Sequence, residues 1–123
     1  MTHVIVRIST ISIPASRISE YIVHVYRDLI PNFEVAEGLE WVWFLRRRLG
    51  TYVEVVTISV WQSEGALTRF FENWPFSEAT KEYLGIEFEP RIYTVWASRP
   101  GHARRQREAR STEEKPDDVV DQT

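Results

Sequence analysis

Apolar residues in the first 97 positions alternate between two spacings, and the order of these spacings restricts the fold more than any single motif does. Residues 4–13 (VIVRISTISI) follow the two-residue period of a β-strand. Over residues 16–30 the apolar side chains recur every three or four positions, which predicts a helix. Because proline lacks the backbone N–H that a helix needs, we expect this helix to end at Pro31-Asn32.

The next two apolar segments predict a β-hairpin. Aromatic and β-branched side chains occupy both faces over residues 39–45, so we expect a strand that is covered on both sides. Gly50-Thr51 predicts a tight turn into a second strand over residues 52–61. The cleaner apolar face of that second strand consists of Val56, Ile58 and Val60.

A second helix and a last strand complete the pattern. Ser63 is suited to cap a helix over residues 64–74, because a serine hydroxyl can accept a hydrogen bond from the first helical turn. Residues 88–96 alternate as a strand, and Pro90 places its first half at a sheet edge or a bulge. With right-handed crossovers, this β-α-β-β-α-β order predicts a ferredoxin-like α+β domain, a four-stranded antiparallel sheet with two helices on one face.

This architecture leaves the other face of the sheet bare. In either register that face carries several large aromatic side chains out of Trp41, Trp43, Phe44, Trp61, Tyr93 and Trp96. A contiguous apolar patch larger than a few hundred Å² marks an interaction surface. We therefore expect a symmetric homodimer in which two sheets pack face to face.

Composition sets the limits of the domain and excludes several partners. Residues 101–123 contain no aromatic side chain, so we expect a folded domain over residues 1–100 followed by a charged, disordered tail. A formal net charge of −3 disfavours nucleic-acid binding. No apolar run reaches the roughly 20 residues that cross a bilayer, so we expect no membrane association. The absence of cysteine excludes disulfides and suits a cytoplasmic location.

Residues 37–71 (EGLEWVWFLRRRLGTYVEVVTISVWQSEGALTRFF) resemble the antibiotic biosynthesis monooxygenase family of dimeric α+β barrel proteins. The matching positions are Gly38-Leu39 at the start of the strand, Trp61 and Ser63 at the strand-to-helix passage, and Ala66, Leu67 and Phe70 in the helix. With ISIPASRI as the first strand-to-helix passage, the resemblance covers residues 4–97. The superfamily also contains isomerases, cyclases and peroxidases, so the resemblance is more specific for fold than for chemistry.

The resemblance argues against haem. Haem-degrading members of the family use an asparagine on the first strand, a tryptophan on the second helix and a histidine shortly after it. This sequence has Ser9, Phe70 and Thr80 at those positions. Because the missing histidine is the axial ligand of the iron, we expect no haem, and no metal-ligand cluster is visible.

Cofactor-independent members of the family oxidise electron-rich aromatic polyketides in a pocket between helices and sheet. The resemblance implies such a monooxygenase here, acting on a small aromatic or polyketide-type compound. Catalytic candidates are His24 and Arg91, and Arg7 is a further polar contact. Ligand-pocket candidates are Ser9, Phe70, Phe71, Trp74 and Tyr83, although ordinary core packing also explains each aromatic ring. Two alternatives remain open: a non-catalytic ligand-binding or assembly module, and a cofactor-free isomerase or cyclase.

Overall fold

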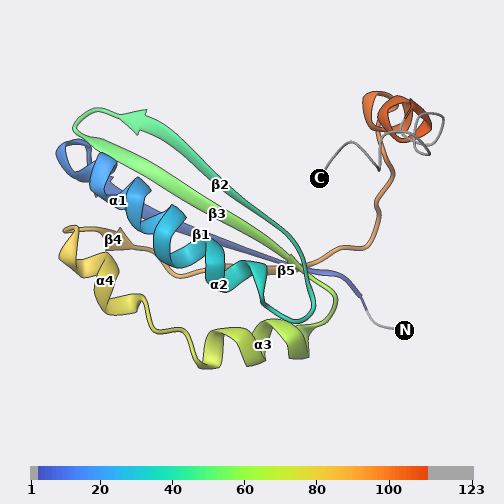
Figure 1. Ribbon diagram of the computed structural model, residues 1–123, viewed down its shortest axis with the longest axis horizontal. Coiled ribbons are helices and arrows are strands. Elements are labelled where there is room, and N and C mark those ends of the chain that lie inside the picture. The colour runs from blue at the N-terminus through green and yellow to red at the C-terminus, as the bar shows by residue number, and fades with distance from the viewer. Residues whose placement is uncertain (1–2, 111–123) are drawn as a thin grey trace, which may run out of the picture.

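An antiparallel sheet forms the centre of the domain in the computed structural model, which describes residues 3–110 (Figure 1). Its strands lie in the order β2-β3-β1-β4, and β5 pairs with β1 further along the same edge. The strands are β1 (Ile5–Pro14), β2 (Leu39–Leu49), β3 (Tyr52–Trp61), β4 (Ile86–Glu87) and β5 (Arg91–Thr94). Because Pro90 cannot donate to the ladder, the last strand is split into β4 and β5, consistent with the predicted edge or bulge.

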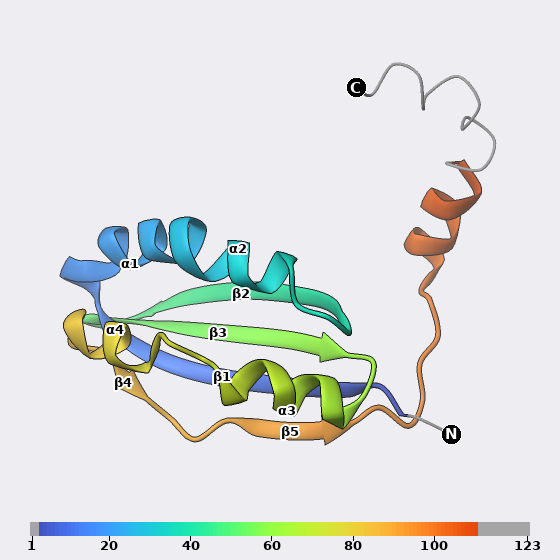
Figure 2. The same cartoon turned by 60° about the horizontal axis from the view of Figure 1, so that its bottom comes forward.

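Two groups of helices lie side by side on one face of this sheet (Figure 2), and we call them the first and the second helical layer. The first consists of η1 (Ala15–Arg17), α1 (Ile18–His24), η2 (Val25–Leu29) and α2 (Ile30–Glu34), and the second of α3 (Glu64–Glu72) and α4 (Ser77–Glu82). Ser63 caps α3, because its Oγ accepts a hydrogen bond from the Ala66 N–H at 3.1 Å. The ferredoxin-like α+β fold predicted from the sequence is confirmed.

The first helical segment does not end at Pro31, and this prediction is wrong. The chain remains helical through α2, with Pro31 in its first turn. The residues before it form a π-helical turn, in which the Ile30 N–H bonds the Val25 carbonyl. A π turn is wider than an α turn, so the proline ring and its missing donor are accommodated there. Asn32 contributes a further bond from Nδ2 to the Asp28 carbonyl at 2.7 Å.

The strand register decides which side chains lie under the helices. The β3 residues with buried side chains on that face are Val53, Val55, Thr57, Ser59 and Trp61. The cleaner apolar face of β3, with Ile58 at its centre, therefore points away from the helices. On the same open face lie Trp41 and Trp43 of β2, whose rings are 5.9 Å apart.

Strand β2 is covered on one side only, contrary to the prediction of cover on both sides. Its Val42 and Phe44 side chains pack against the buried cluster around Trp61. By contrast, Trp41 and Trp43 are 59% and 47% exposed on the open face. Within the described chain, the sheet thus has one helix-covered face and one apolar face without a cover.

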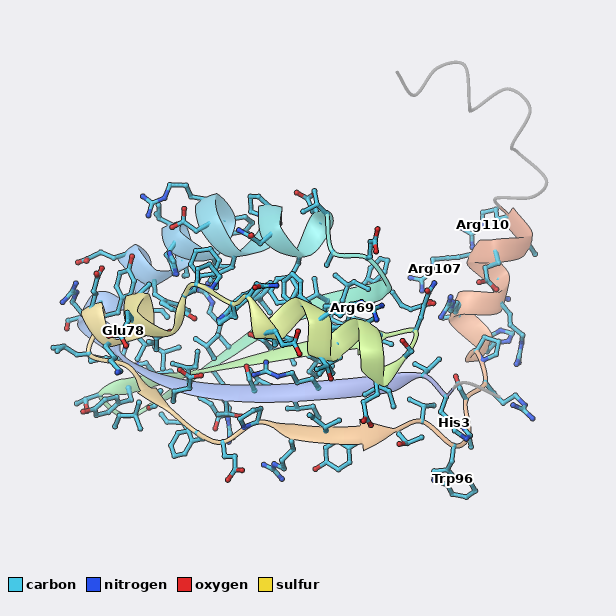
Figure 3. All side chains as sticks on the ribbon, turned by 90° about the horizontal axis from the view of Figure 1, so that it is seen from below. His3, Arg69, Glu78, Trp96, Arg107 and Arg110 are labelled. Atoms are coloured by element: carbon cyan, nitrogen blue, oxygen red, sulfur yellow. The ribbon has the colours of Figure 1, made fainter. Side chains whose placement is uncertain are left out.

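The chain leaves the sheet after β5 and, within the described residues, continues into a separate helical segment. Residues 102–110 are helical and exposed throughout (Figure 3). Trp96, on the extended passage between β5 and this helix, is 90% exposed. The remainder of the predicted tail, residues 111–123, lies outside the described residues.

Candidate functional site

Polar side chains interrupt the helix-covered face of the sheet. Arg7 and Ser9 of β1 lie directly opposite Ser59 and Thr57 of β3 in the register. Paired residues of antiparallel strands project to the same face, so these four form one polar patch beneath the helices. The patch is an exception in a core that is otherwise apolar, and buried polar groups usually have a specific partner or role.

Two apolar clusters lie on either side of the polar patch. The first surrounds Ile13 and Tyr21 under α1, and the second surrounds Trp61 and Leu67 under α3. Phe44 and Trp74 contact both clusters and so connect them. The polar patch is therefore held in place by a close-packed apolar surrounding on both sides.

A small cavity lies at the junction of these clusters, and we call it the polar cavity. Its volume is about 40 Å³, which leaves room for a few small polar atoms, since one water molecule needs roughly 10–15 Å³ of cavity. The polar residues that line it are Arg7, Ser9, Thr57, Thr80 and Glu87. The aromatic residues that line it are Tyr21, Phe33, Phe44, Phe71, Trp74 and Phe76.

Three hydroxyl groups face the polar cavity without a protein partner. Ser9, Thr57 and Thr80 are 8%, 9% and 6% exposed, and no hydrogen bond joins their side chains to another described residue. None of the described side chains has a polar atom that is both fully enclosed and unpartnered. The three hydroxyls therefore reach the cavity, where they can donate to or accept from a small guest.

Arg7 supplies the positive charge of the polar cavity. Its guanidinium carbon lies 3.9 Å from the centre of the Phe71 ring, a cation–π contact. Burial lowers the pKa of Arg7 from its usual value, and the negative charge of Glu87 partly opposes that shift. Across residues 3–110, no carboxylate lies within ion-pair distance of this guanidinium. Its N–H donors are therefore not consumed by an internal ion pair.

Tyr21 separates the polar cavity from a neighbouring cluster on α1. Burial raises the pKa of the Tyr21 phenol to about 12, with smaller contributions from Glu87 and Tyr83. On its other side, the Tyr21 ring contacts the rings of His24 and Tyr83. His24 is 3% exposed, and its Nδ1 lies 2.6 Å from Oδ2 of Asp28. His24 itself is not among the residues that line the polar cavity.

The structure brings together some of the site residues predicted from sequence and separates others. Ser9, Phe71 and Trp74 line the polar cavity. Phe70 lies beside them and packs on the Trp61 ring at 5.2 Å. Tyr83 lies with His24 in the neighbouring cluster, at 5.5 Å between ring centres.

Arg91 is remote from all of these residues. It is exposed and pairs with Ile8 in the register, which places it on the open face of the sheet. The catalytic roles of His24 and Arg91 stay predictions.

Thr57 and Glu87 were not predicted as site residues from the sequence. Each is an isolated polar residue in a strand, where it has the pattern of an ordinary solvent-facing position. One pattern in the sequence could have indicated the site. Two polar residues two positions apart in β1 pair with two polar residues two positions apart in β3. That signal depends on the register, which the sequence pattern does not fix.

A larger hollow runs between the first helical layer and β2, and we call it the edge groove. Its volume is about 460 Å³, within the roughly 300–1,000 Å³ of small-molecule sites. It is mostly apolar, with Ile22 and Val25 on the helical side and Trp43 on the strand side. Tyr21 and Phe44 line both the edge groove and the polar cavity, so these two rings form the wall between them.

Residues 3–110 contain neither a metal-ligand cluster nor a membrane-spanning helix. No cluster of three or more potential ligand side chains has a geometry that could hold a metal ion. No helix in this range combines the length and apolarity needed to cross a membrane.

No family model matches the chain, and no relative was found among curated proteins. Solved structures do resemble it. A variant of SnoaB, a cofactor-independent oxygenase from Streptomyces nogalater, aligns with a TM-score of 0.63 and 17% identity over 80% of this chain and 99% of that one. An antibiotic biosynthesis monooxygenase-like protein from Bacillus cereus aligns at 0.56, with 20% identity over 80% of this chain and 99% of that one.

A third similar structure is described as a dimeric ferredoxin-like protein and comes from an uncultured marine organism. It aligns with a TM-score of 0.61 and 9% identity, covering 79% of this chain and 99% of that one. At such identities the similarity establishes the fold and not the chemistry. The chain therefore has the ferredoxin-like α+β fold found in antibiotic biosynthesis monooxygenase-like proteins.

Proposed function

We propose that this protein is a cofactor-independent monooxygenase that oxidises a small aromatic or polyketide-type compound at the polar cavity. One observation carries the proposal: a cavity on the helix-covered face of the sheet combines three unpartnered hydroxyls and a cation with aromatic side chains. Burial strengthens electrostatic contacts and keeps bulk water from a reactive anion. The fold shared with a cofactor-independent oxygenase supports the proposal.

The proposed chemistry begins with deprotonation of a phenol or of an activated methylene group. Electrons of the resulting anion pass to dioxygen; one oxygen atom becomes a carbonyl oxygen of the product, and the other leaves as water with the two methylene hydrogens. Arg7 and the hydroxyls stabilise the anion. Glu87 is exposed and lines the same cavity, so it can accept the proton and pass it to solvent.

An aromatic substrate needs more room than the polar cavity has at present. A volume of about 40 Å³ admits dioxygen or a single polar head group but not a ring. Phe71 and Trp74 are both half-buried, so each ring has one side near the surface. We propose that these two rings move outward and that the substrate ring takes their place against the cavity.

The test is oxygen consumption with 1,8-dihydroxyanthrone, which consumes one dioxygen and releases one water as it becomes the corresponding anthraquinone. We expect the protein to raise this rate above the spontaneous rate, and the Arg7→Met variant to lose most of the increase. Arg99→Met removes an equal charge from an exposed position and is the control. Oxygen uptake no faster than in buffer would contradict the proposal.

The aromatic packing around the polar cavity favours a second candidate function, a non-catalytic ligand-binding or assembly module. Phe71 and Trp74 pack on each other at 5.2 Å and occupy the space that a substrate ring would need. A protein of this kind would bind aromatic compounds without consuming oxygen. Oxygen uptake and calorimetry together separate the two functions. Binding detected by calorimetry without oxygen uptake supports the module.

We further propose that the protein is a homodimer joined through the open face of the sheet. Apolar side chains form rows across that face, and one row runs from Trp43 through Ile58 to Ile8. A parallel row runs from Trp41 through Val60 and Val6 to Tyr93. A surface of this kind buries itself when two copies meet about a twofold axis.

Sedimentation tests the dimer. We expect the natural protein to sediment as a dimer at micromolar concentration and Ile58→Glu to sediment as a folded monomer, because the new charge would be buried between two sheets. Val23→Glu is the matched control, since Val23 is an apolar residue 56% exposed on α1. A natural protein that sediments as a monomer would rule out this interface.

A further inference from the structure

We propose that the polar cavity is a recognition site for an anionic oxygen, so that the ligand binds as a carboxylate, phenolate or enolate with Arg7 as its counter-charge. The inference deepens the proposed function and rests on it for the aromatic body of the ligand. The recognition of charge stands on the geometry of the cavity itself.

The surroundings of Arg7 favour an anionic ligand. Its guanidinium is half-buried against the Phe71 ring, and the described residues offer no carboxylate within ion-pair distance. A buried cation usually has a partner, because desolvation without one is costly. A cation–π contact supplies only part of that compensation. An anion at this position would complete it.

The hydroxyls that accompany this cation also favour an anion. Ser9, Thr57 and Thr80 come from three different elements, β1, β3 and α4, and line one cavity. Each hydroxyl has one hydrogen to donate. Donors that converge on one small space from rigid elements are the usual structure of an oxyanion site.

The size of the cavity limits the part of a ligand that can enter it. A cavity of about 40 Å³ accepts the oxygen atoms of a head group and leaves the rest of the ligand outside. Phe71, Trp74 and Phe76 also line the cavity and are half-buried, so an aromatic body can take the place of the outward-moving Phe71 and Trp74 rings beside the head group. This arrangement predicts a ligand with a charged end and an apolar, planar end.

Replacing Glu87 should change the affinity for an anion in the opposite direction to replacing Arg7. This carboxylate lines the cavity and acts electrostatically on Arg7 from beyond ion-pair distance. The negative charge of Glu87 would therefore repel a bound anion. Replacing Glu87 should strengthen anion binding, whereas replacing Arg7 should weaken it.

The experiment is calorimetric titration under nitrogen with 1-naphthoate and with its neutral isostere 1-naphthamide. We expect 1-naphthoate to bind at least about tenfold more tightly than the amide, and Arg7→Met to lose at least about tenfold in affinity. Arg7→Lys should retain part of the affinity, Glu87→Gln should bind more tightly than the natural protein, and the control Arg99→Met should bind equally well. Titration with 4-nitrophenolate adds an absorbance readout: a shifted band identifies phenolates as ligands, and binding confined to 1-naphthoate identifies carboxylates.

Equal affinity for 1-naphthoate and 1-naphthamide would overturn the inference, as would an Arg7→Met variant that melts normally and binds 1-naphthoate unchanged. If Arg7→Met does not fold, Thr80→Val and Arg7→Lys decide, because Thr80→Val keeps the side-chain volume and removes one donor. Both variants binding 1-naphthoate as tightly as the natural protein would then overturn it. The titration under nitrogen measures binding alone, so intact binding there, combined with no added oxygen uptake in the 1,8-dihydroxyanthrone assay, contradicts the proposed monooxygenase and not the anion site.

Discussion

Nδ1 of His24 lies 2.6 Å from Oδ2 of Asp28, one helical turn further along, and Arg27 donates two hydrogen bonds to the same carboxylate. The His24 ring is enclosed by the rings of Tyr21, Phe76 and Tyr83. Asp28 thus fixes the orientation of a buried imidazole that joins the first helical layer to α4. These contacts make Asp28 sensitive to acid in a predictable direction.

The first prediction concerns acid stability. The hydrogen bond from Arg27, followed by that from His24, lowers the pKa of Asp28 from 3.8 to about 2. A carboxyl group with a depressed pKa stabilises the folded state above its unfolded pKa, and this contribution is lost as the pH falls towards 2. We expect Asp28→Asn to be less stable than the natural protein at pH 5, with the difference shrinking at lower pH. Urea unfolding from pH 5 to 2.5 measures it, and a pH-independent difference would contradict the prediction.

The second prediction concerns alkaline stability. Tyr21 is 2% exposed, and its pKa is raised from 10.0 to about 12. Between these values the unfolded chain releases a proton that the folded chain keeps, so the free energy of unfolding falls as the pH rises. The loss amounts to up to roughly 3 kcal/mol over the two pH units. Tyr21→Phe should show a shallower decline in urea unfolding from pH 9 to 11, and equal slopes would exclude this origin.

The third prediction compares two glycines with positive φ. At Gly38 (φ 83°) an added Cβ would lie 2.5 Å from the Ala66 Cβ, whereas at Gly50 (φ 62°) it would meet nothing within 4 Å. Left-handed backbone costs an L-residue about 1–2 kcal/mol, and a tight contact in a packed core adds about 1–3 kcal/mol. We expect Gly38→Ala to lose about 3 kcal/mol and the control Gly50→Ala about 1 kcal/mol. Equal losses in urea unfolding would show that the Gly38–Ala66 contact relaxes freely.

The fourth prediction concerns the hydrogen bond from Trp61 Nε1 to Ser59 Oγ, 2.9 Å long and inaccessible to solvent. Ser59→Ala leaves the indole N–H buried without an acceptor, which costs about 1–3 kcal/mol. In a Trp61→Phe background the same change should cost less, because no N–H remains. The difference between the two losses, measured by urea unfolding, is the coupling of this pair, and a coupling of zero would contradict its role.

Much of the fold followed from local patterns. The two-residue period identified β1 and β3, aromatic and β-branched side chains identified β2, and Gly50 marked the hairpin between β2 and β3. Ser63 was recognised as the cap of α3 because capping chemistry is local. The prediction at Pro31 failed for a related reason: the rule that proline ends a helix assumes α geometry, and the π turn over Val25–Leu29 removes that assumption.

The candidate site was only partly predictable. Ser9, Phe71 and Trp74 were expected in one pocket and do line one cavity, although sequence alone could not show that the space between them is so small. Thr57 and Glu87 were absent from the prediction, because a polar residue in a strand has the same local signal under a helix as in solvent. Arg91 was expected beside the others and lies on the opposite face of the sheet.

The sequence by itself determined the order of strands and helices, the positions of turns and caps, and the existence of two faces on each strand. These depend on spacing and on residues adjacent in the chain. Only the tertiary structure decided which face the helices cover. The helices cover Thr57, Ser59 and Trp61 and leave open the face of β3 that carries Val56, Ile58 and Val60. A period of two defines two faces but not their environment, which depends on pairing between distant strands and on the volumes that pack between them.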